Sequence, residues 1–187
     1  LDKINLNPDL VEEVLMGNVV QAGTGQAPAR QAAIFAGIPD TVPCTTVNKV
    51  CSSGMKAIMF GSQSIALGQA EVILAGGMES MSNIPYYVPK MRWGSKFGGA
   101  EMVDGLQKDG LIDAYDHQAM GNSGDATSEK YGFSREDQDA YAIRSYQRAA
   151  KATENGSFKK EIVAIEIPQR KRDPIVMTDD EEYKNVK

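Results

Sequence analysis

The feature that most constrains this chain is an alternation of short apolar runs with helical patterns in its first half. Three apolar runs, at residues 14–20, 45–50 and 72–75, are bounded by turn-forming residues, which predicts buried strands. The two segments between them, at 28–35 and 52–67, have helical patterns and are each closed by a glycine. Because alternating strands and helices build a parallel sheet, the sequence predicts an α/β fold.

The predicted helix at 52–67 has a stripe of small residues. It contains Gly54 and Gly61, and Gly68 follows at the same spacing. Glycine inside a helix costs about 1 kcal/mol relative to alanine, so the stripe indicates close packing against a neighbouring element. We therefore expect this helix to be central and buried. Simple packing of the helix on the sheet explains the glycines whether or not the helix has a further role.

The second half of the chain is less regular and more polar. Residues 85–110 combine prolines and glycines and predict a long irregular segment, of a kind that is more often functional than idle. Ser134 and Asp137 have the spacing of a capping box and predict the start of a helix. A strand is predicted at 161–167, ended by Pro168.

Charge and composition exclude several classes of partner. The formal net charge of −5 and the absence of a long basic run argue against nucleic acid as a partner. No stretch approaches the roughly 18 apolar residues that span a bilayer, so no membrane is expected either. Two cysteines are too few for a disulfide framework and fit a reducing compartment, although a single bridge is not excluded by counting. The chain begins with Leu1 and ends in a charged run, so we expect a longer protein.

Cys51 lies where the second predicted strand meets the second predicted helix. A helix N-terminus presents free backbone N–H groups and the positive end of the helix dipole, and both favour the thiolate form of a cysteine. The same N–H groups can hold the oxyanion that forms when a thioester carbonyl is attacked. One interpretation is that Cys51 is a nucleophile. The other is that Cys51 is a small, inert residue buried among apolar side chains.

Longer motifs decide between these readings. Residues 47–57, Val-Asn-Lys-Val-Cys-Ser-Ser-Gly-Met-Lys-Ala, resemble the acyl-enzyme motif of the thiolase family. The segments 76–82, 25–30 and 108–111, and the Met-Gly pair at 120, are similar to further thiolase motifs in the family's order. The resemblance implies that Cys51 is the nucleophile that carries the acyl group.

The resemblance also implies an architecture. We expect the N-terminal αβαβα half of a duplicated, five-layered thiolase fold, with an inserted mixed α/β loop domain. Residues 1–82 would be the core domain, incomplete at its start, and residues 83–187 the loop domain that covers the coenzyme A site. Leu111 and Met120 would then line the channel for pantetheine and coenzyme A as an apolar wall.

Among thiolases, the details are most similar to the acetyl-CoA acetyltransferases of lipid metabolism. This type implies acetyl-CoA and acetoacetyl-CoA as substrates, no covalent cofactor, and a homodimer or homotetramer. Tyr146 is similar to a tyrosine that helps to bind potassium in mitochondrial acetoacetyl-CoA enzymes; its other reading is an ordinary helix residue. Together with the acidic run at 179–184, Tyr146 favours the mitochondrial matrix over the cytoplasm as the compartment.

The chain also departs from the family pattern. Ala119 stands before the Met-Gly pair, where many relatives have histidine, and His117 is interpreted as a loop residue. The family's activating histidine, in a Gly-His-Pro context, and its second cysteine, in a Cys-x-Gly-Gly-Gly context, have no counterpart in the 187 residues. Cys44 fits no proton-transfer role and is interpreted as structural. We therefore expect that this chain alone neither fully activates Cys51 nor turns over.

Three alternatives stay open on the sequence. The chain could be a noncatalytic module that binds acyl-CoA, or part of a 3-ketoacyl-CoA thiolase of fatty-acid β-oxidation. It could also be related to the ketoacyl-ACP synthases, which share the fold and a nucleophilic cysteine. The motif at residues 47–57 argues against the last of these.

Overall fold

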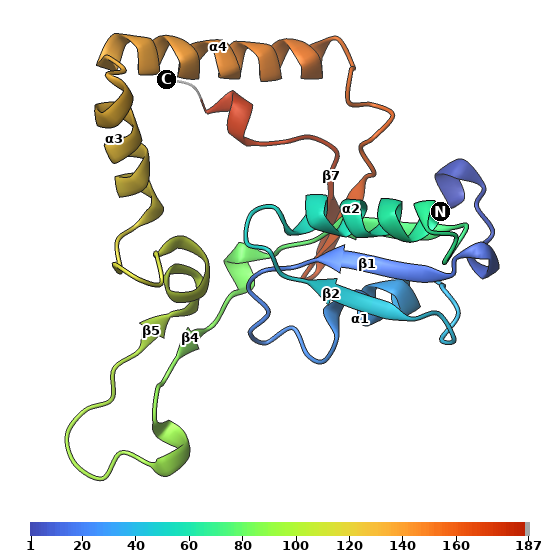
Figure 1. Ribbon diagram of the computed structural model, residues 1–187, viewed down its shortest axis with the longest axis horizontal. Helices are drawn as coiled ribbons and strands as arrows, with labels where there is room; N and C mark the ends of the chain where they lie inside the picture. The colour runs from blue at the N-terminus through green and yellow to red at the C-terminus, as the bar shows by residue number, and fades with distance from the viewer. Residues whose placement is uncertain (186–187) are drawn as a thin grey trace. The chain divides into compact units, whose positions relative to one another are not determined.

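The computed structural model describes residues 1–185. The chain forms two compact units, Leu1–Asn122 and Ser123–Lys187. The predicted boundary between a core domain and a loop domain, at residues 82 and 83, lies inside the first unit and stays a prediction. The first unit carries the following helices and strands (Figure 1): β1 (Glu13–Gly17), α1 (Pro28–Phe35), β2 (Cys44–Val47), α2 (Ser53–Ala66), β3 (Ile73–Gly77), β4 (Tyr86–Tyr87) and β5 (Val103–Asp104).

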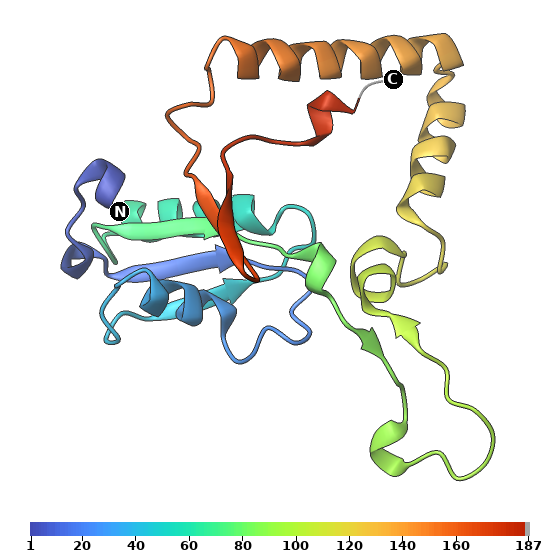
Figure 2. The same cartoon turned by 180° about the vertical axis from the view of Figure 1, so that it is seen from behind.

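The first unit is built on a parallel sheet. Its strand order is β2-β1-β3, and β1 pairs in parallel with both neighbours. Helix α2 covers one face of the sheet and α1 the other (Figures 1 and 2). The predicted parallel α/β fold is therefore confirmed.

The core of this unit has two layers because successive strand residues point to opposite faces. Val14 of β1 packs with Ala33 of α1 on one face. Its neighbour Leu15 packs with Ala57 of α2 on the other face. A strand that is buried on both sides reads as a continuous apolar run, which is the pattern that predicted it.

Two predicted strands are shorter than the apolar runs suggested. β1 ends at Gly17 and β2 at Val47, whereas runs to residues 20 and 50 were predicted. The three residues after each strand leave the sheet because they form loops that contact the start of α2 and the segment after β3. The prediction that Cys51 directly ends a strand is therefore wrong.

Helix α2 is less buried than predicted. Gly61 faces the sheet, where an added Cβ would lie 3.2 Å from the Ile73 side chain. In the helix and at its C-cap, however, Met55, Ile58 and Leu67 are exposed. The glycines thus report close packing on the sheet, as expected, and they carry no information about the outer face.

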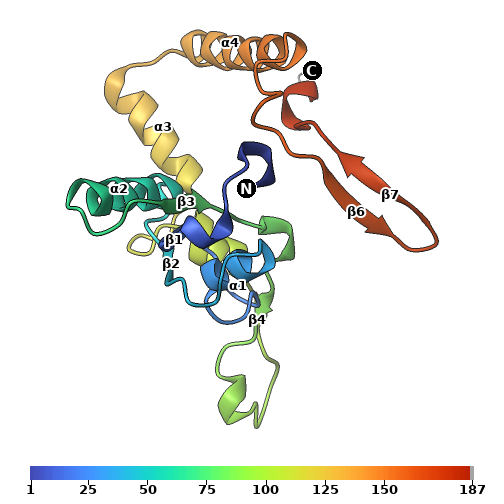
Figure 3. The same ribbon diagram turned by 90° about the vertical axis from the view of Figure 1, so that its right-hand side faces the viewer.

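The second unit is a mixed α/β lobe. A 20-residue helix, α4 (Arg135–Glu154), begins with the predicted capping box between Ser134 and Asp137. Two antiparallel strands form a hairpin, β6 (Ile165–Gln169) and β7 (Arg172–Met177) (Figure 3). A helix that the sequence pattern did not predict, α3 (Met120–Tyr131), spans the boundary between the units.

The predicted strand at 161–167 begins later, at Ile165, and continues through Pro168. Proline has no N–H to donate, so the ladder cannot stay regular at this position. The strand therefore does not end at Pro168. Its register with the partner strand shifts between Ile167 and Gln169. The expectation that Pro168 terminates the strand is therefore wrong.

Short helical turns complete the described part of the chain: η1 (Asp2–Ile4), η2 (Pro8–Leu10), η3 (Met81–Asn83), η4 (Met91–Trp93), the π-helical turn η5 (Gln107–Leu111) and η6 (Glu182–Lys184). Within residues 1–185, no helix is both long enough and apolar enough to cross a membrane.

Glu12, just before β1, is hydrogen-bonded to the two residues that precede β3. Its carboxylate accepts hydrogen bonds from the amides of Glu71 and Val72, and these bonds lower the pKa of Glu12 below its ordinary value of 4.5. A lowered pKa means that Glu12 stabilises the fold above pH 4.5 and that this contribution disappears as the pH falls through the folded-state pKa.

We therefore expect Glu12→Gln to be less stable than the wild type near neutral pH, with a difference that shrinks in acid. Urea unfolding between about pH 7 and pH 3 measures it, because linkage requires stability to follow the proton uptake of Glu12. A difference that is the same at every pH would contradict this role.

Candidate active site

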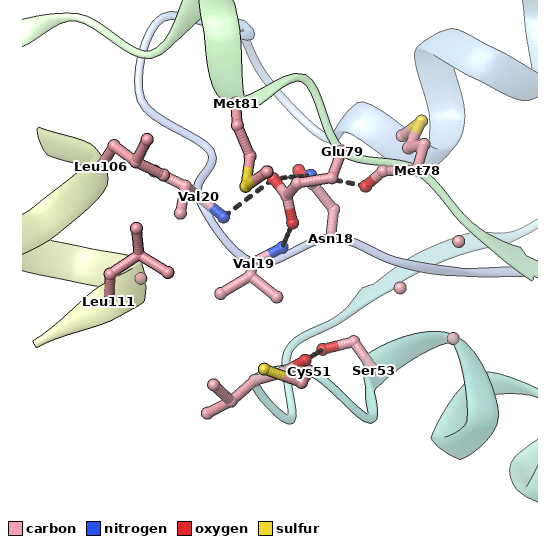
Figure 4. Close-up of a pocket in the computed structure, with 15 residues that line it drawn as sticks. Asn18, Val19, Val20, Cys51, Ser53, Met78, Glu79, Met81, Leu106 and Leu111 are labelled. Atoms are coloured by element: carbon pink, nitrogen blue, oxygen red, sulfur yellow. Dashed lines mark hydrogen bonds between the residues drawn. The ribbon is translucent and has the colours of Figure 1, made fainter. Parts of the chain in front are cut away.

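A cavity of about 430 Å³ lies at the carboxyl ends of β1 and β3. In open parallel sheets this edge is where ligands bind. The cavity wall is formed by the loop after β1, the turn before α2, the segment after β3 and the turn η5. Figure 4 shows Cys51 on one side of the cavity, with Glu79 and Val19 on the opposite side and Leu106 and Leu111 beside them.

Cys51 is exposed and lies in a tight turn between β2 and α2. The expectation, in the alternative interpretation, that Cys51 is buried is therefore wrong. The residue before it, Val50, has a left-handed backbone with φ of 49°. This conformation is unfavourable for a β-branched residue and persists only where surrounding contacts hold it.

Ser53, the first residue of α2, holds this turn from the inside. Its hydroxyl donates to the carbonyl of Val50 at 2.6 Å and accepts from the amide of Lys49 at 2.8 Å. Ser53 is buried, and both bonds are partly buried. The Ser53 hydroxyl thus restrains the backbone before Cys51 at two points, the amide of Lys49 and the carbonyl of Val50.

The N-terminus of α2, which begins two residues after Cys51, presents free donors. The amides of Gly54 and Met55 have no hydrogen-bond acceptor among residues 1–185. Unpaired amides and the aligned peptide dipoles give this helix end a partial positive charge. The predicted association of Cys51 with a helix N-terminus is therefore confirmed, with a turn between the strand and the helix.

Glycines allow α2 to approach the sheet this closely. An added Cβ at Gly17 would lie 2.4 Å from the backbone nitrogen of Gly54, and one at Gly77 would lie 3.3 Å from its Cα. Both glycines are the last residues of their strands. The backbone contact places the start of α2, and with it Cys51, directly over the carboxyl edge of the sheet.

The opposite wall of the cavity is held by Glu79. Its carboxylate accepts from the amides of Val19 and Val20, at 2.9 and 3.1 Å, and from the side chain of Asn18 at 3.0 Å. The parallel register that pairs Gly17 with Gly77 brings the two segments together. Three donors on one carboxylate fix the loop after β1 (Figure 4).

Asn18 is buried in this wall with one atom unsatisfied. Its Nδ2 donates to the carbonyl of Met78 and to Glu79, whereas its Oδ1 has no donor among the described residues. Buried acceptors in folded proteins nearly always have a partner. A water molecule or a ligand N–H would satisfy this atom.

The turn η5 reaches the site through a small residue. An added Cβ at Gly110 would lie 3.2 Å from the Val20 side chain. This approach places Leu106 and Leu111 in the wall of the same cavity as Cys51. The structure therefore brings two of the predicted site residues together, Cys51 and Leu111. That Leu111 contacts coenzyme A stays a prediction.

The two other predicted site residues, Met120 and Tyr146, belong to the helices α3 and α4. Met120 begins α3, is 44% exposed and does not line the cavity. Tyr146, on α4, donates to Glu182 at 2.8 Å, and this bond raises the pKa of Tyr146. No group of three or more metal-binding side chains occurs within the described range. The roles of Met120 and Tyr146 stay predictions.

The positions of His117 and Cys44 agree with what the sequence predicted for them. His117 lies in a loop, with a left-handed φ of 61°, and is not in the cavity wall. Cys44 begins β2, packs at the edge of the core and is a free thiol, so it has a structural place.

Sequence reasoning missed the polar residues that hold the site. Glu79 and Asn48 lie inside the motifs at residues 76–82 and 47–57, but neither motif predicted a role for them. An acidic residue directly after a buried strand of a parallel sheet is a usable signal, because it reaches the loops at the same edge. Asn48 carries a weaker signal, an asparagine directly before a turn.

Comparison with known proteins identifies the family of this chain. The family described as thiolase, N-terminal domain, matches residues 1–187. Acetyl-CoA acetyltransferase of Schizosaccharomyces pombe is 52% identical over 100% of this chain and 47% of its own length. Acetyl-CoA acetyltransferase 2 of Arabidopsis thaliana is 51% identical over 97% of this chain and 45% of its own length. The chain thus spans about half the length of these relatives.

The structure is similar to a solved thiolase as well. The crystal structure of Acat5 thiolase from Ascaris suum in complex with coenzyme A matches 97% of this chain and 45% of the other, with 46% identity and a TM-score of 0.88. The fold, the motif around Cys51 and the match along the whole sequence all indicate the same family. This chain belongs to the thiolase family and corresponds to its N-terminal domain.

Proposed function

We propose that the protein containing this chain transfers acyl groups between coenzyme A thioesters, with Cys51 as the covalent carrier. The observation that carries the proposal is the exposed Cys51 thiol, held in a cavity at the N-terminus of α2. Relatives named acetyl-CoA acetyltransferase support acetyl-CoA as the donor and a second acetyl-CoA, or coenzyme A in reverse, as the acceptor.

In the first step, the Cys51 thiolate attacks the carbonyl carbon of acetyl-CoA. A bond forms between Sγ and the acetyl carbon, the bond to the coenzyme A sulfur breaks, and the departing thiolate takes up a proton. The positive end of α2 and the free amides of Gly54 and Met55 favour the negative charge that develops beside them.

In the second step, a base removes a proton from the methyl carbon of another acetyl-CoA. The resulting carbanion attacks the acetyl group on Cys51, a carbon–carbon bond forms, and the cysteine thiolate is released with acetoacetyl-CoA as product. Thiolysis is the reverse reaction. The base and a second cysteine are proposed to come from the Gly-His-Pro and Cys-x-Gly-Gly-Gly motifs that thiolases carry outside this domain, because neither motif occurs in this sequence.

Finer assignments belong to the same proposal. Leu111 and Met120 are proposed to form the apolar wall beside pantetheine, Tyr146 to contribute to a potassium site, and the protein to assemble as a homodimer or homotetramer in the mitochondrial matrix. The segment 83–187 is proposed to be the loop domain over coenzyme A. The apolar character of Leu111 and its place beside Cys51 support the first of these.

Incubation of the complete gene product with acetyl-CoA is expected to add one acetyl group to Cys51. Intact-mass measurement followed by peptide mapping detects the adduct, and Cys44→Ala serves as the control that must still be labelled. Binding of coenzyme A without an adduct on Cys51 would instead favour the noncatalytic module. Faster thiolysis of long-chain 3-ketoacyl-CoA than of acetoacetyl-CoA would favour the β-oxidation enzyme.

A further inference from the structure

Glu79 and Cys51 lie on opposite walls of the cavity, but a continuous series of hydrogen bonds connects them. The Glu79 carboxylate holds the amide of Val19 at 2.9 Å. The carbonyl of the same Val19 accepts from Nδ2 of Asn48 at 3.2 Å. On its other side, Oδ1 of Asn48 accepts from the amide of Val50 at 3.1 Å. Val50 is the residue that precedes Cys51.

Each member of this series has a defined part. Glu79 fixes the loop after β1, because its two oxygens accept from two consecutive amides, those of Val19 and Val20. Asn48 bridges from this loop to the turn before α2, since one end of its amide donates and the other accepts. The series ends on the left-handed peptide of Val50.

The end point explains why such a bridge matters. A β-branched residue at φ of 49° relaxes to an extended or helical backbone unless its neighbours prevent it. Rotation of this peptide would change the direction of Cys51, which follows it directly. Ser53 restrains the carbonyl of Val50 from the side of α2, whereas Asn48 restrains its amide from the side of the sheet.

We propose that Glu79 is a positioning residue that acts through Val19 and Asn48 to hold the strained turn at Val50, and so aims the Cys51 thiol into the cavity. The proposal rests on the proposed function of Cys51 as nucleophile. It assigns Glu79 and Asn48 one shared task, although they lie on different segments of the chain.

Two substitutions interrupt the series at different points while keeping side-chain size. Glu79→Gln places an NH₂ group, which cannot accept, in the position of one carboxylate oxygen. Asn48→Asp keeps the acceptor for the amide of Val50 and loses the donor to Val19. If both residues act through one series, the double variant is no slower than the slower single variant, because coupled residues are not additive.

Glu12→Gln is the matched control. Glu12 also accepts two backbone amides, those of Glu71 and Val72, but it lies before β1, at the opposite edge of the sheet from the cavity. Its loss removes the same kind of bond from the same sheet. Comparison with Glu79→Gln therefore separates an effect on the stability of the fold from an effect on the position of the Cys51 thiol.

The experiment uses the complete gene product and two rates on Cys51. Single-turnover acetylation by acetyl-CoA, followed by intact mass, is expected to slow about 10- to 100-fold in Glu79→Gln and in Asn48→Asp, as misplaced reacting groups do. The rate at which iodoacetamide alkylates Cys51, measured from about pH 6 to pH 9, is expected to differ from the wild-type rate in the same two variants. Glu12→Gln is expected to keep both wild-type rates, although its thermal stability is also expected to fall.

Three results would overturn the proposal: wild-type acetylation and alkylation rates in Glu79→Gln, losses in the two single variants that multiply in the double variant, or an equal rate loss in Glu12→Gln. If the wild type is not acetylated at all, the proposed function fails. The alkylation rates still decide the positioning role in that case, because iodoacetamide reads the Cys51 thiol without any coenzyme A ester.

Discussion

Cys51→Ala is expected to lower the acyl-transfer rate of the complete gene product by about 10⁴-fold or more, as removal of a covalent nucleophile does in other enzymes. Alanine leaves the turn and the cavity in place but removes the only atom in this wall that can form a thioester. Neither half of the reaction can then proceed, because both form or break a bond to Sγ. Steady-state thiolysis of acetoacetyl-CoA, followed by the loss of its absorbance, measures the change.

Cys44→Ala is the matched control for this prediction. Cys44 lies on β2, half-buried against the core cluster around Val14, and is the other cysteine of the chain. Its replacement is expected to keep the rate within a few-fold of the wild type. Cys51→Ser adds a second test, since an oxygen in the same position is a poorer nucleophile at neutral pH. Substantial thiolysis by Cys51→Ala would exclude Cys51 as the acyl carrier.

Gly17→Ala is expected to lower the free energy of unfolding by about 1–3 kcal/mol or more, because an added methyl group overpacks a close contact. The new Cβ would lie 2.4 Å from the nitrogen of Gly54 and 2.5 Å from the carbonyl carbon of Ser53. Both are backbone atoms, so no flexible side chain can move aside. Helix α2 must shift, and acylation of Cys51 is expected to fall with it. Urea unfolding and the acetylation assay measure the two effects.

Gly124→Ala is the matched control for the glycine prediction. Gly124 lies in α3 with no neighbouring atom within 4 Å of an added Cβ, and its φ is not in the left-handed region. Alanine is expected to raise stability here by up to about 1 kcal/mol, through helix propensity alone. If Gly17→Ala were as stable as the wild type, the close approach of α2 to the end of β1 would not hold.

Regular elements could be predicted from the sequence because their signals are local. Helix α1 was predicted at its observed bounds, and the capping box at the start of α4 follows from two residues three positions apart. The ends of β1 and β2 were misjudged because Asn18 and Asn48 begin loops whose hydrogen bonds go to distant segments. Helix α3 was missed because its composition is polar and small, without an apolar stripe.

The candidate site divides along the same line. The sequence alone indicated the family and predicted Cys51 as the nucleophile, because the motif around Cys51 is contiguous along the chain. Only the tertiary structure decided what holds Cys51 in position: Asn18 and Glu79 are 61 residues apart and meet because Gly17 pairs with Gly77 in the parallel sheet. Pairing register is a property of the packed sheet, and no local pattern in either strand specifies which loop ends the other will contact.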